Sequence, residues 1–377
     1  MNKKRSYHLV IGSGTYFDGV VNDVLQKKTT KSFMDLVKES DANRNAHSCK
    51  KIEAQNVIVK NNHYHGIVEA AHDRLGPLIE ELTSEDATIM VHNPPKVLMD
   101  YINEKNERSL INLTIHREKY SIEKNSKMFS YRISKIEELI IGQSEAIQEI
   151  SKSLWYLTNT NRTNPYVIML YGNSSLGKTE LVREVAKHFY DGKVLEKHLS
   201  MFKNPIYSDY FFGESPNRRS LGYDLLERES NLIFFDELDK CPEHFYSAFY
   251  TLFDNAMFKD ATYDVDVSGI VIVLTSNYHT KSEMMKQLGL PIFYRIDKFI
   301  HFKDFDSDTI HSLVVKEIHE RRDDYCKKYT EEQMYALISP NISVVGENAR
   351  TIKYKIQEEI ENIMFEDVSG INSKSLI

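Results

Sequence analysis

With 377 residues, the chain exceeds the size that one hydrophobic core usually serves, so we expect two domains and a smaller appendage. A hydrophobic fraction of 41% and a mean hydropathy of -0.45 are typical of a globular protein, and no run approaches the roughly 18 apolar residues of a membrane span. We therefore expect a cytoplasmic protein with no membrane partner. The net charge of -7 argues against a nucleic-acid partner, and the isolated Cys49, Cys241 and Cys326 indicate neither a disulfide framework nor a zinc ribbon.

Residues 1–117 alternate short apolar runs with helical patterns. Strands are expected at 8–11, 56–59 and 87–91, and each leads through a polar loop into a helical pattern. A fourth apolar run, at 110–115, is expected to close the sheet. This alternation predicts a parallel α/β domain of Rossmann type.

The loops after these strands are rich in polar residues. In a parallel α/β sheet such loops meet at one edge, which predicts either a pocket for a nucleotide or signal molecule or plain loop and capping roles. The glycines Gly12, Gly14 and Gly19 depart from the G-x-G-x-x-G pattern, so a dinucleotide is not indicated. The three histidines of this edge form an alternative metal-ligand set. The edge residues are Ser13, Gly14, Thr15, His63, His65, His92 and Asn93.

The most informative stretch lies between an apolar run at 166–171 and a helix-prone segment at 180–184. It reads Gly172-Asn173-Ser174-Ser175-Leu176-Gly177-Lys178-Thr179, which fits the strand, glycine-rich loop and helix of a phosphate-binding loop. The glycines allow close backbone approach, and the helix N-terminus presents N–H donors to phosphate. Lys178 is expected to reach the β- and γ-phosphates of ATP, and the Thr179 hydroxyl to bind Mg²⁺. The alternative is an ordinary glycine turn.

An apolar strand that starts at Leu232 ends in two carboxylates, Asp236 and Glu237. A buried strand delivers both side chains to the phosphate end of a sheet, where Asp236 can hold Mg²⁺ through water and Glu237 can orient and deprotonate the attacking water. A further apolar strand, at 270–274, has a polar tip that ends at Asn277. For both strands, the alternative is a structural strand with a polar end.

Over residues 136–366 the chain resembles the AAA+ ATPases of the Clp type, on an ordered series of motifs that begins with Ile141-Gly142-Gln143. The resemblance implies that Ile141 and Gly142 lie over the adenine of ATP. It also implies that Asn277 is the sensor-1 residue, between the γ-phosphate and the attacking water. The implied nucleotide-binding set is Ile141, Gly142, Gly172, Asn173, Ser174, Ser175, Leu176, Gly177, Lys178, Thr179, Glu180, Asp236 and Arg350.

Two arginines complete the implied catalytic set with Glu237, Lys178 and Asn277. Arg295 matches the arginine finger of the family, which enters the site of the neighbouring subunit and stabilises charge on the γ-phosphate. It implies a homo-oligomeric ring, expected to be a hexamer. Arg350 matches the sensor-2 arginine of the family's lid, although the second basic position of that motif falls between Lys353 and Tyr354.

The expected organisation combines these observations. A Rossmann-like domain at 1–117 is followed by a polar linker at 118–135, a large α/β ATPase domain at 136–305 and a mainly helical lid at 306–377. We identify no family resemblance in the first of these. The fold class is α/β, with a parallel-sheet domain followed by a phosphate-loop α/β domain and a helical lid.

The sequence does not identify the process that ATP hydrolysis would drive. Clp-type rings grip polypeptide with an aromatic-hydrophobic-glycine loop in the pore, and Phe211-Phe212-Gly213 stands near that position; the alternative is a core aromatic pair. The leading hypothesis is a Mg²⁺-dependent ATPase ring that remodels or threads a protein substrate selected by the N-terminal domain. The rival is a signalling switch, as in bacterial defence, in which the N-terminal domain senses a small nucleotide or metabolite and the ring recruits an effector protein.

Overall fold

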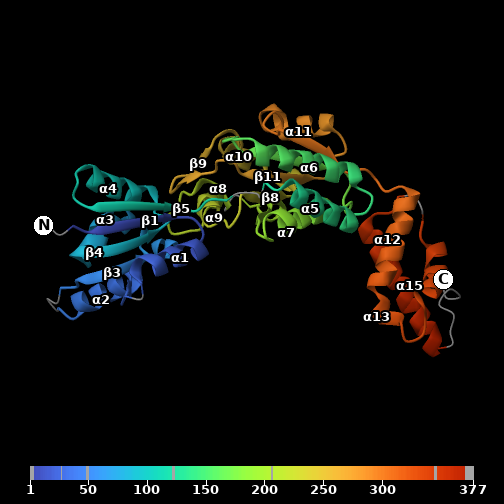
Figure 1. Ribbon diagram of the computed structural model, residues 1–377, viewed down its shortest axis with the longest axis horizontal. Helices are drawn as coiled ribbons and strands as arrows, with labels where there is room; N and C mark the ends of the chain where they lie inside the picture. The colour runs from blue at the N-terminus through green and yellow to red at the C-terminus, as the bar shows by residue number, and fades with distance from the viewer. Residues whose placement is uncertain are drawn as a thin grey trace.

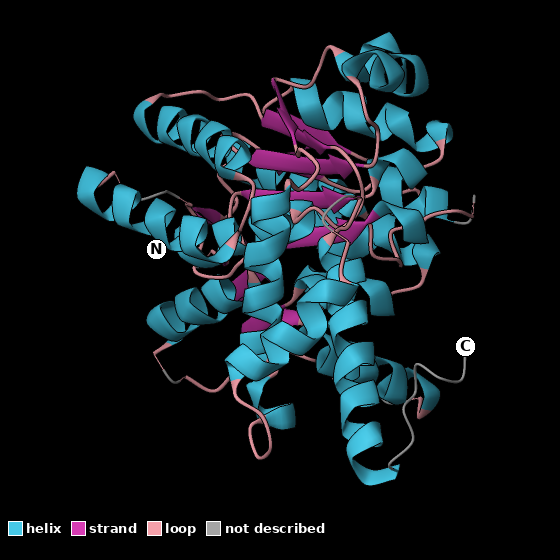
Figure 2. Cartoon of the chain, turned by 90° about the vertical axis from the view of Figure 1, so that its right-hand side faces the viewer, coloured by secondary structure: helices cyan, strands magenta, loops and turns pink. Residues whose placement is uncertain are grey.

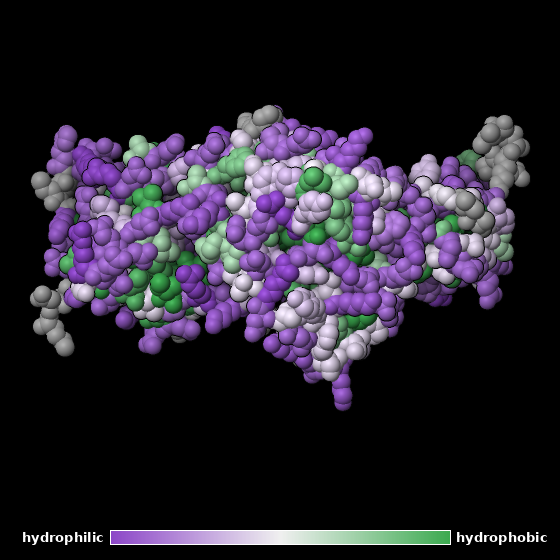
Figure 3. All heavy atoms as spheres, turned by 90° about the horizontal axis from the view of Figure 1, so that it is seen from above, coloured by the Kyte–Doolittle hydropathy of each residue, from purple (hydrophilic) through white to green (hydrophobic). Residues whose placement is uncertain are grey.

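The computed structural model describes residues 4–26, 28–47, 51–120, 124–204, 207–343 and 346–369, so Cys49 and the end of the expected lid lie outside the described residues. An N-terminal α/β domain, a central α/β domain and a C-terminal helical domain follow one another along the molecule (Figure 1). This arrangement confirms the α/β fold class. Polar side chains cover much of the face in Figure 3, and no helix within the described ranges has the length and apolar character to cross a membrane.

The N-terminal domain is built on a five-stranded sheet, parallel throughout, in the order β2-β3-β4-β1-β5. Leu9 of β1 lies opposite Val91 of β4 and Ile115 of β5. The last strand, expected at 110–115, begins two residues later because a turn after the preceding helix uses residues 108–110. The strands are Ser6–Ile11 (β1), Lys31–Ser32 (β2), Ala54–Val59 (β3), Thr83–His92 (β4) and Asn112–Arg117 (β5).

Helices cover both faces of this sheet. Tyr7 and Leu9 pack toward α2, α3 and α4, while Val10 packs toward Phe17 of α1, as the two-residue period of a strand requires. The helical pattern expected after the strand at 56–59 becomes α-helical only at Leu75, because the residues before it form the 3-10 segments Asn61–Gly66 (η1) and Glu69–Arg74 (η2). The helices are Gly14–Leu25 (α1), Phe33–Asn45 (α2), Leu75–Glu81 (α3) and Lys96–Glu107 (α4).

The central domain has a second parallel sheet, in the order β12-β6-β11-β8-β7, with helices on both sides of the strands (Figure 2). Ile168 and Leu170 of β6 pack toward α5, α6 and α7, and Val167 and Met169 pack toward α10 and α11. The strands are Tyr166–Tyr171 (β6), Leu195–His198 (β7), Leu232–Asp236 (β8), Val271–Ser276 (β11) and Lys298–His301 (β12), and Met257–Lys259 (β9) and Asp264–Asp266 (β10) form a separate antiparallel pair.

Seven α-helices of the described residues accompany this sheet: Ser126–Leu139 (α5), Ser144–Asn159 (α6), Lys178–Phe189 (α7), Ser208–Phe212 (α8), Leu221–Leu226 (α9), Tyr246–Asp254 (α10) and Lys281–Phe293 (α11). Three 3-10 segments of this domain are Leu199–Met201 (η3), Leu238–Lys240 (η5) and Glu243–Phe245 (η6). Because β6, β8 and β11 run in parallel as neighbours, their carboxyl ends meet at one edge. The phosphate-binding loop, the two carboxylates and Asn277 follow those ends.

The stretch expected to be a linker, 118–135, ends in a helix. The Asn125 side chain caps α5 by accepting from the backbone N–H groups of residues 127 and 128. Phe129 is buried, with its ring 5.0 Å from Trp155 and 4.9 Å from Phe189. We therefore group α5 with the central domain and keep the remaining domain bounds as a proposal.

The C-terminal domain is helical in its described residues. Asp306 caps α12 by accepting from the N–H of Thr309 at 2.8 Å, and Thr330 and Gln333 form a capping box at the start of α14. Its core packs Ile310 and Val314 against Ile356. The elements are Ser307–Glu320 (α12), Arg322–Tyr325 (α13), Glu331–Ile338 (α14), Ser339–Asn341 (η7) and Ala349–Ser369 (α15).

Candidate functional site

The glycine-rich loop joins β6 to α7. Gly172 has a φ of 134°, and a Cβ at this position would lie 2.3 Å from the carbonyl oxygen of Phe302, so a larger residue does not fit. Gly177 has a φ of 98° and forms the N-cap of α7. The loop backbone can therefore approach a ligand closely at the N-terminus of a 12-residue helix.

Lys178 is the first residue of α7 and is buried. Its Nζ donates to the carbonyl oxygens of Gly172 and Asn173, at 2.7 and 2.6 Å, and to Asn277 Oδ1 at 3.2 Å. Burial lowers the pKa of Lys178 to about 8, while neighbouring aspartates act in the opposite direction. The ammonium group therefore stays inside the loop and is charged at neutral pH.

The carboxylate of Asp236, at the end of β8, and the backbone of Glu237, directly after it, are held by residues of neighbouring elements. Asp236 lies at the end of β8, with its carboxylate oxygens 3.4 and 3.5 Å from the Thr179 hydroxyl and one of them 3.2 Å from His198 Nδ1. The Thr275 hydroxyl donates to Asp236 and accepts from the backbone N–H of Glu237 at 2.9 Å. Glu237 has a φ of 60°, in the left-handed region that non-glycine residues rarely adopt. One buried hydroxyl thus fixes both residues.

Asn277 follows β11 and joins the same group. Its amide oxygen accepts from Lys178, and its backbone N–H and Nδ2 lie 3.3 and 3.5 Å from the carboxylate oxygens of Asp239. Asp239 belongs to η5, directly after Glu237 and Leu238. The amide of Asn277 is therefore oriented from both sides.

A cavity of about 460 Å³ brings these groups together with the start of α15. The backbone N–H of Ala349 donates to the Ser175 carbonyl at 3.2 Å, which places Arg350 beside the loop. Lys353 also lines the cavity, whereas Tyr354 does not and is 67% exposed. Of these two candidates for the second basic position, Lys353 is therefore the one that faces the cavity. The lining is Ser174, Ser175, Gly177, Lys178, Thr179, Glu180, Asp236, Glu237, Thr275, Asn277, Ala349, Arg350 and Lys353.

The segment expected over the adenine lies between this loop and the C-terminal domain. A Cβ on Gly177 would contact Ile140 at 3.9 Å, and a Cβ on Gly142 would lie 2.2 Å from Thr309 at the start of α12. Buried Gln143 donates to the Lys303 carbonyl at 2.9 Å. Ile141 and Gly142 therefore stand beside both the loop and the C-terminal helices.

Comparison with known proteins supports a family assignment for part of the chain. A family model described as AAA domain (Cdc48 subfamily) matches residues 163–340. The chaperone protein ClpB of Rickettsia felis is 26% identical over 274 residues, which cover 60% of this chain and 31% of that protein. The chain carries an AAA+ module of the Clp type.

Other relatives agree with this assignment. The chloroplastic chaperone protein ClpC2 of Oryza sativa subsp. japonica is 27% identical over 217 residues, 52% of this chain and 23% of the relative. The mitochondrial disaggregase of Rattus norvegicus is 26% identical over 161 residues, 38% of this chain and 23% of the relative. The matched part of this chain thus spans less than a third of the length of these curated relatives.

Arg295 is the one expected catalytic residue that does not line the cavity around Lys178 and Glu237. Its Nε forms an ion pair with Asp254 at 2.6 Å, one amino group donates to the Pro291 carbonyl at 2.7 Å, and its guanidinium lies 4.9 Å from the Tyr250 ring. A role in a neighbouring subunit therefore stays a proposal. Tyr294 beside it is 73% exposed.

The structure places Phe211 in the core of the AAA+ module. Its side chain is 1% exposed and stacks on Phe245, with ring centroids 4.6 Å apart. Gly213 is equally confined, because a Cβ there would lie 2.5 Å from the Asp260 side chain. Phe212 is half-buried, and its carbonyl accepts from the N–H of Ala261 at 2.8 Å. The core alternative therefore holds for Phe211, and Phe212 is the more exposed ring of the pair.

Truncation of the Phe211 side chain is expected to destabilise the AAA+ module. Replacing buried Phe211 by Ala removes an aromatic side chain from a packed cluster and should lower the free energy of unfolding by about 3–5 kcal/mol. Phe212→Ala is the matched control and should cost less, because its side chain retains contact with water. Urea unfolding followed by circular dichroism measures both; equal losses would contradict the packing described for Phe211.

The polar edge of the N-terminal sheet does not bring its histidines together as a metal site. His63 Nδ1 accepts from the backbone N–H of Lys60 at 3.1 Å, His65 lies 5.0 Å from the Tyr223 ring, and His92 Nε2 lies 2.8 Å from the Gly12 carbonyl oxygen. Within the described ranges no group of three or more His, Cys, Asp or Glu side chains is placed to hold a metal ion. The alternative metal set is therefore wrong, and these histidines have loop and contact roles.

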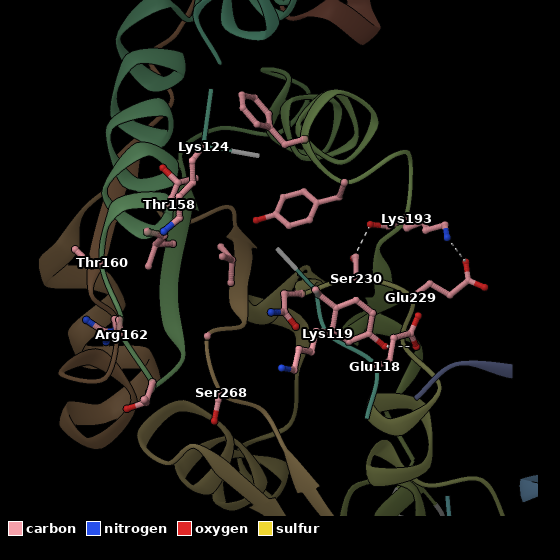
Figure 4. Close-up of a pocket in the computed structure, with 18 of the residues that line it drawn as sticks. Glu118, Lys119, Lys124, Thr158, Thr160, Arg162, Lys193, Glu229, Ser230 and Ser268 are labelled. Atoms are coloured by element: carbon pink, nitrogen blue, oxygen red, sulfur yellow. Dashed lines mark hydrogen bonds and ion pairs between the residues drawn. The ribbon is translucent and has the colours of Figure 1, made fainter. Parts of the chain in front are cut away.

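A second cavity, of about 640 Å³, is larger than the cavity around Lys178 and lies near the amino ends of β8 and β11. Figure 4 shows Lys193 there, whose carbonyl accepts from the Ser230 hydroxyl at 2.7 Å and whose Nζ lies 3.7 Å from Glu229. None of the residues expected to bind ATP lines it. We therefore place the candidate site at the opposite edge of the sheet, where the phosphate-binding loop lies.

Sequence reasoning missed three residues of the AAA+ site. Thr275 belongs to the polar tip that ends at Asn277, whereas Asp239 stands two positions after Glu237, beyond the strand motif. His198 ends β7, which carries no motif of its own. The polar tips of neighbouring strands are the available signal for Thr275 and His198, and nearness to the two carboxylates is the signal for Asp239.

Proposed function

We propose that this chain is a Mg²⁺-dependent ATPase that assembles as a ring, with six subunits expected, and remodels or threads a protein substrate selected by its N-terminal domain. The observation that carries the ATPase proposal is the single cavity that holds the phosphate-binding loop, Asp236, Glu237, Asn277 and Arg350. Each of these groups has a distinct task in phosphoryl transfer from ATP to water.

The donor set of the cavity fits both ATP and Mg²⁺. Lys178 and the N–H groups at the start of α7 would hold the phosphates. The Thr179 hydroxyl, next to the Asp236 carboxylate, provides the oxygen ligands that Mg²⁺ prefers while leaving positions for phosphate and water. When bound, Mg²⁺ would neutralise charge on the phosphate oxygens.

Water activation falls to Glu237 in this proposal. Glu237 lines the cavity, and Thr275 holds its backbone in position. Glu237 would accept a proton from the attacking water, while Asn277 would orient that water against the γ-phosphate. Arg350 and Lys178 would stabilise the charge that develops on the phosphate oxygens, and Arg295 of a neighbouring subunit would add to it.

The protein-substrate part of the proposal rests on the relatives, whose names describe chaperones and a disaggregase.

The rival is the assembly switch, in which the N-terminal domain senses a ligand and the ring recruits an effector. Contact between the polar edge of the N-terminal sheet and the AAA+ module is the observation that favours it. Phe212→Ala should abolish threading while leaving ligand-driven assembly largely intact, and Phe211 is unsuitable for this comparison because it is buried.

The oligomeric state of the protein tests the proposed ring directly. The Glu237→Gln variant, which binds ATP without turning it over, should grow from a small species to about six subunits on addition of ATP and Mg²⁺, measured by size-exclusion chromatography with light scattering. Adding Arg295→Ala to this variant should prevent growth while ATP still binds. Arg183→Ala is the control, because Arg183 is also a partly exposed arginine in an ion pair, with Glu196 at 3.0 Å. A species that stays monomeric while it binds ATP would remove the finger role from Arg295.

A further inference from the structure

A set of buried amide groups lies at the carboxyl end of the N-terminal sheet. Asn93, after β4, accepts from the N–H of Gly12 at 3.0 Å and donates to its carbonyl at 2.8 Å, which fixes the amide. Asn61, after β3, is 1% exposed and Asn93 is fully buried. The Nδ2 groups of Asn61 and Asn93 therefore form a pair of preorganised donors at this edge.

The group that meets these donors comes from the AAA+ module. Glu227 directly follows α9, and its Oε1 accepts from Asn61 Nδ2 at 2.9 Å and from Asn93 Nδ2 at 3.2 Å. The imidazole of His92 lies 3.6 Å from the same oxygen. Burial lowers the pKa of His92, although Glu227 acts in the opposite direction, so the imidazole is neutral near neutral pH. Neutral N–H donors thus hold the carboxylate.

The hydrogen bonds of the Asn61 side chain cross from the N-terminal domain to the AAA+ module. Asn61 Nδ2 bonds to Glu227, and its Oδ1 accepts from the buried Tyr263 hydroxyl at 3.3 Å, so both polar ends of this side chain bond to the AAA+ module. Beside it, the backbone N–H of Lys96 donates to the Thr262 carbonyl at 2.9 Å. A buried amide keeps its position only where its hydrogen bonds are satisfied, so Asn61 is suited to the docked arrangement.

We propose that this edge of the N-terminal sheet is a carboxylate-binding site, and that its ligand in this chain is the Glu227 side chain, which docks the N-terminal domain on the AAA+ module. A carboxylate accepts hydrogen bonds without donating any, which matches two amide N–H groups aimed at one oxygen. The edge is also where parallel α/β sheets bind ligands, so Glu227 occupies the position of a ligand. From Glu227 the chain runs directly into β8, the strand of Asp236.

Removal of the carboxylate tests the docking role in the full-length chain without nucleotide. Each hydrogen bond to a charged group contributes about tenfold to an equilibrium, so Glu227→Ala should raise amide hydrogen exchange at Lys96 about tenfold or more, because that N–H bonds across the interface. Asn61→Ala should act in the same direction, since its side chain serves this interface. Glu229→Gln is the matched control: Glu229 also reaches the N-terminal domain, but its bond from the exposed Thr15 hydroxyl at 3.2 Å can still be accepted by the amide oxygen of Gln, so exchange should stay unchanged.

Chemical rescue tests the carboxylate chemistry itself. Sodium acetate replaces the part of the side chain that Glu227→Ala removes, and should slow exchange at Lys96 again, whereas the same concentration of sodium chloride should not. Rescue should be lost in the Glu227→Ala, Asn61→Ala double variant, which lacks one of the donors. Unchanged exchange in Glu227→Ala, equal effects of Glu229→Gln, or failure of acetate to act would each overturn the proposal. None of these readouts depends on ATP hydrolysis.

Discussion

Replacing Glu237 with Gln is expected to lower the rate of ATP hydrolysis by about 10²–10⁴-fold, the range that general-base catalysis supplies. The amide has nearly the same shape as the carboxylate but does not accept a proton from water at neutral pH. Because Thr275 bonds to the backbone N–H of residue 237, the substitution should leave the local geometry intact. Affinity for ATP should therefore stay within a few-fold of the parent value.

The measurement is phosphate release at saturating ATP and Mg²⁺, together with equilibrium binding of a fluorescent ATP analogue. Glu243→Gln is the matched control, since Glu243 is exposed and does not line the nucleotide cavity. It should change neither quantity. Hydrolysis that survives in Glu237→Gln at the parent rate would assign water activation to a different group.

Lys178→Met is expected to remove most of the affinity for ATP, by about 100-fold, because a charged hydrogen-bonding group that meets phosphate oxygens contributes about 1.5–3 kcal/mol. Methionine keeps the length of the aliphatic stem and removes the ammonium. Burial of this ammonium is unfavourable, as its lowered pKa indicates, so its loss should not unfold the module.

Isothermal titration with ATP and Mg²⁺ measures the loss, and the thermal midpoint of the variant checks its fold. Lys187→Met on the same helix is the control, because the Lys187 side chain is 61% exposed and pairs with Glu184 at 3.3 Å. ATP binding of parent strength in Lys178→Met would place the phosphates away from the glycine-rich loop.

The sequence predicts well which residues the fold brings together at this cavity, because each stands in a motif with its own spacing. The glycine-rich loop has two positions that only glycine suits, and an apolar strand followed by Asp236 and Glu237 places both carboxylates at the edge of a sheet. Contacts between strands are harder to predict. Thr275 reaches Asp236 because Leu274 lies opposite Phe235 in the parallel pair β11–β8. The register of two strands cannot be predicted from the sequence of either strand alone.

The less predictable features depend on contacts that are distant in sequence. Phe211 has the composition of a pore loop, but Phe202, Phe245 and Phe249 surround it and keep it in the core. Asn61 and Glu227 are polar residues in separate segments, and neither has a pattern that would pair it with the other. Their contact exists only once both domains are folded.

The cavity around Lys178 and Glu237 is expected to hydrolyse ATP. The decisive measurement is phosphate release by the parent chain with Mg²⁺ and again with the metal chelated. We expect steady release that requires Mg²⁺, that disappears in Glu237→Gln, and that rises per subunit with protein concentration, as a role of Arg295 in a neighbouring subunit requires. Absence of release at every protein concentration, in a chain that is folded and binds ATP, would show that this cavity does not hydrolyse ATP.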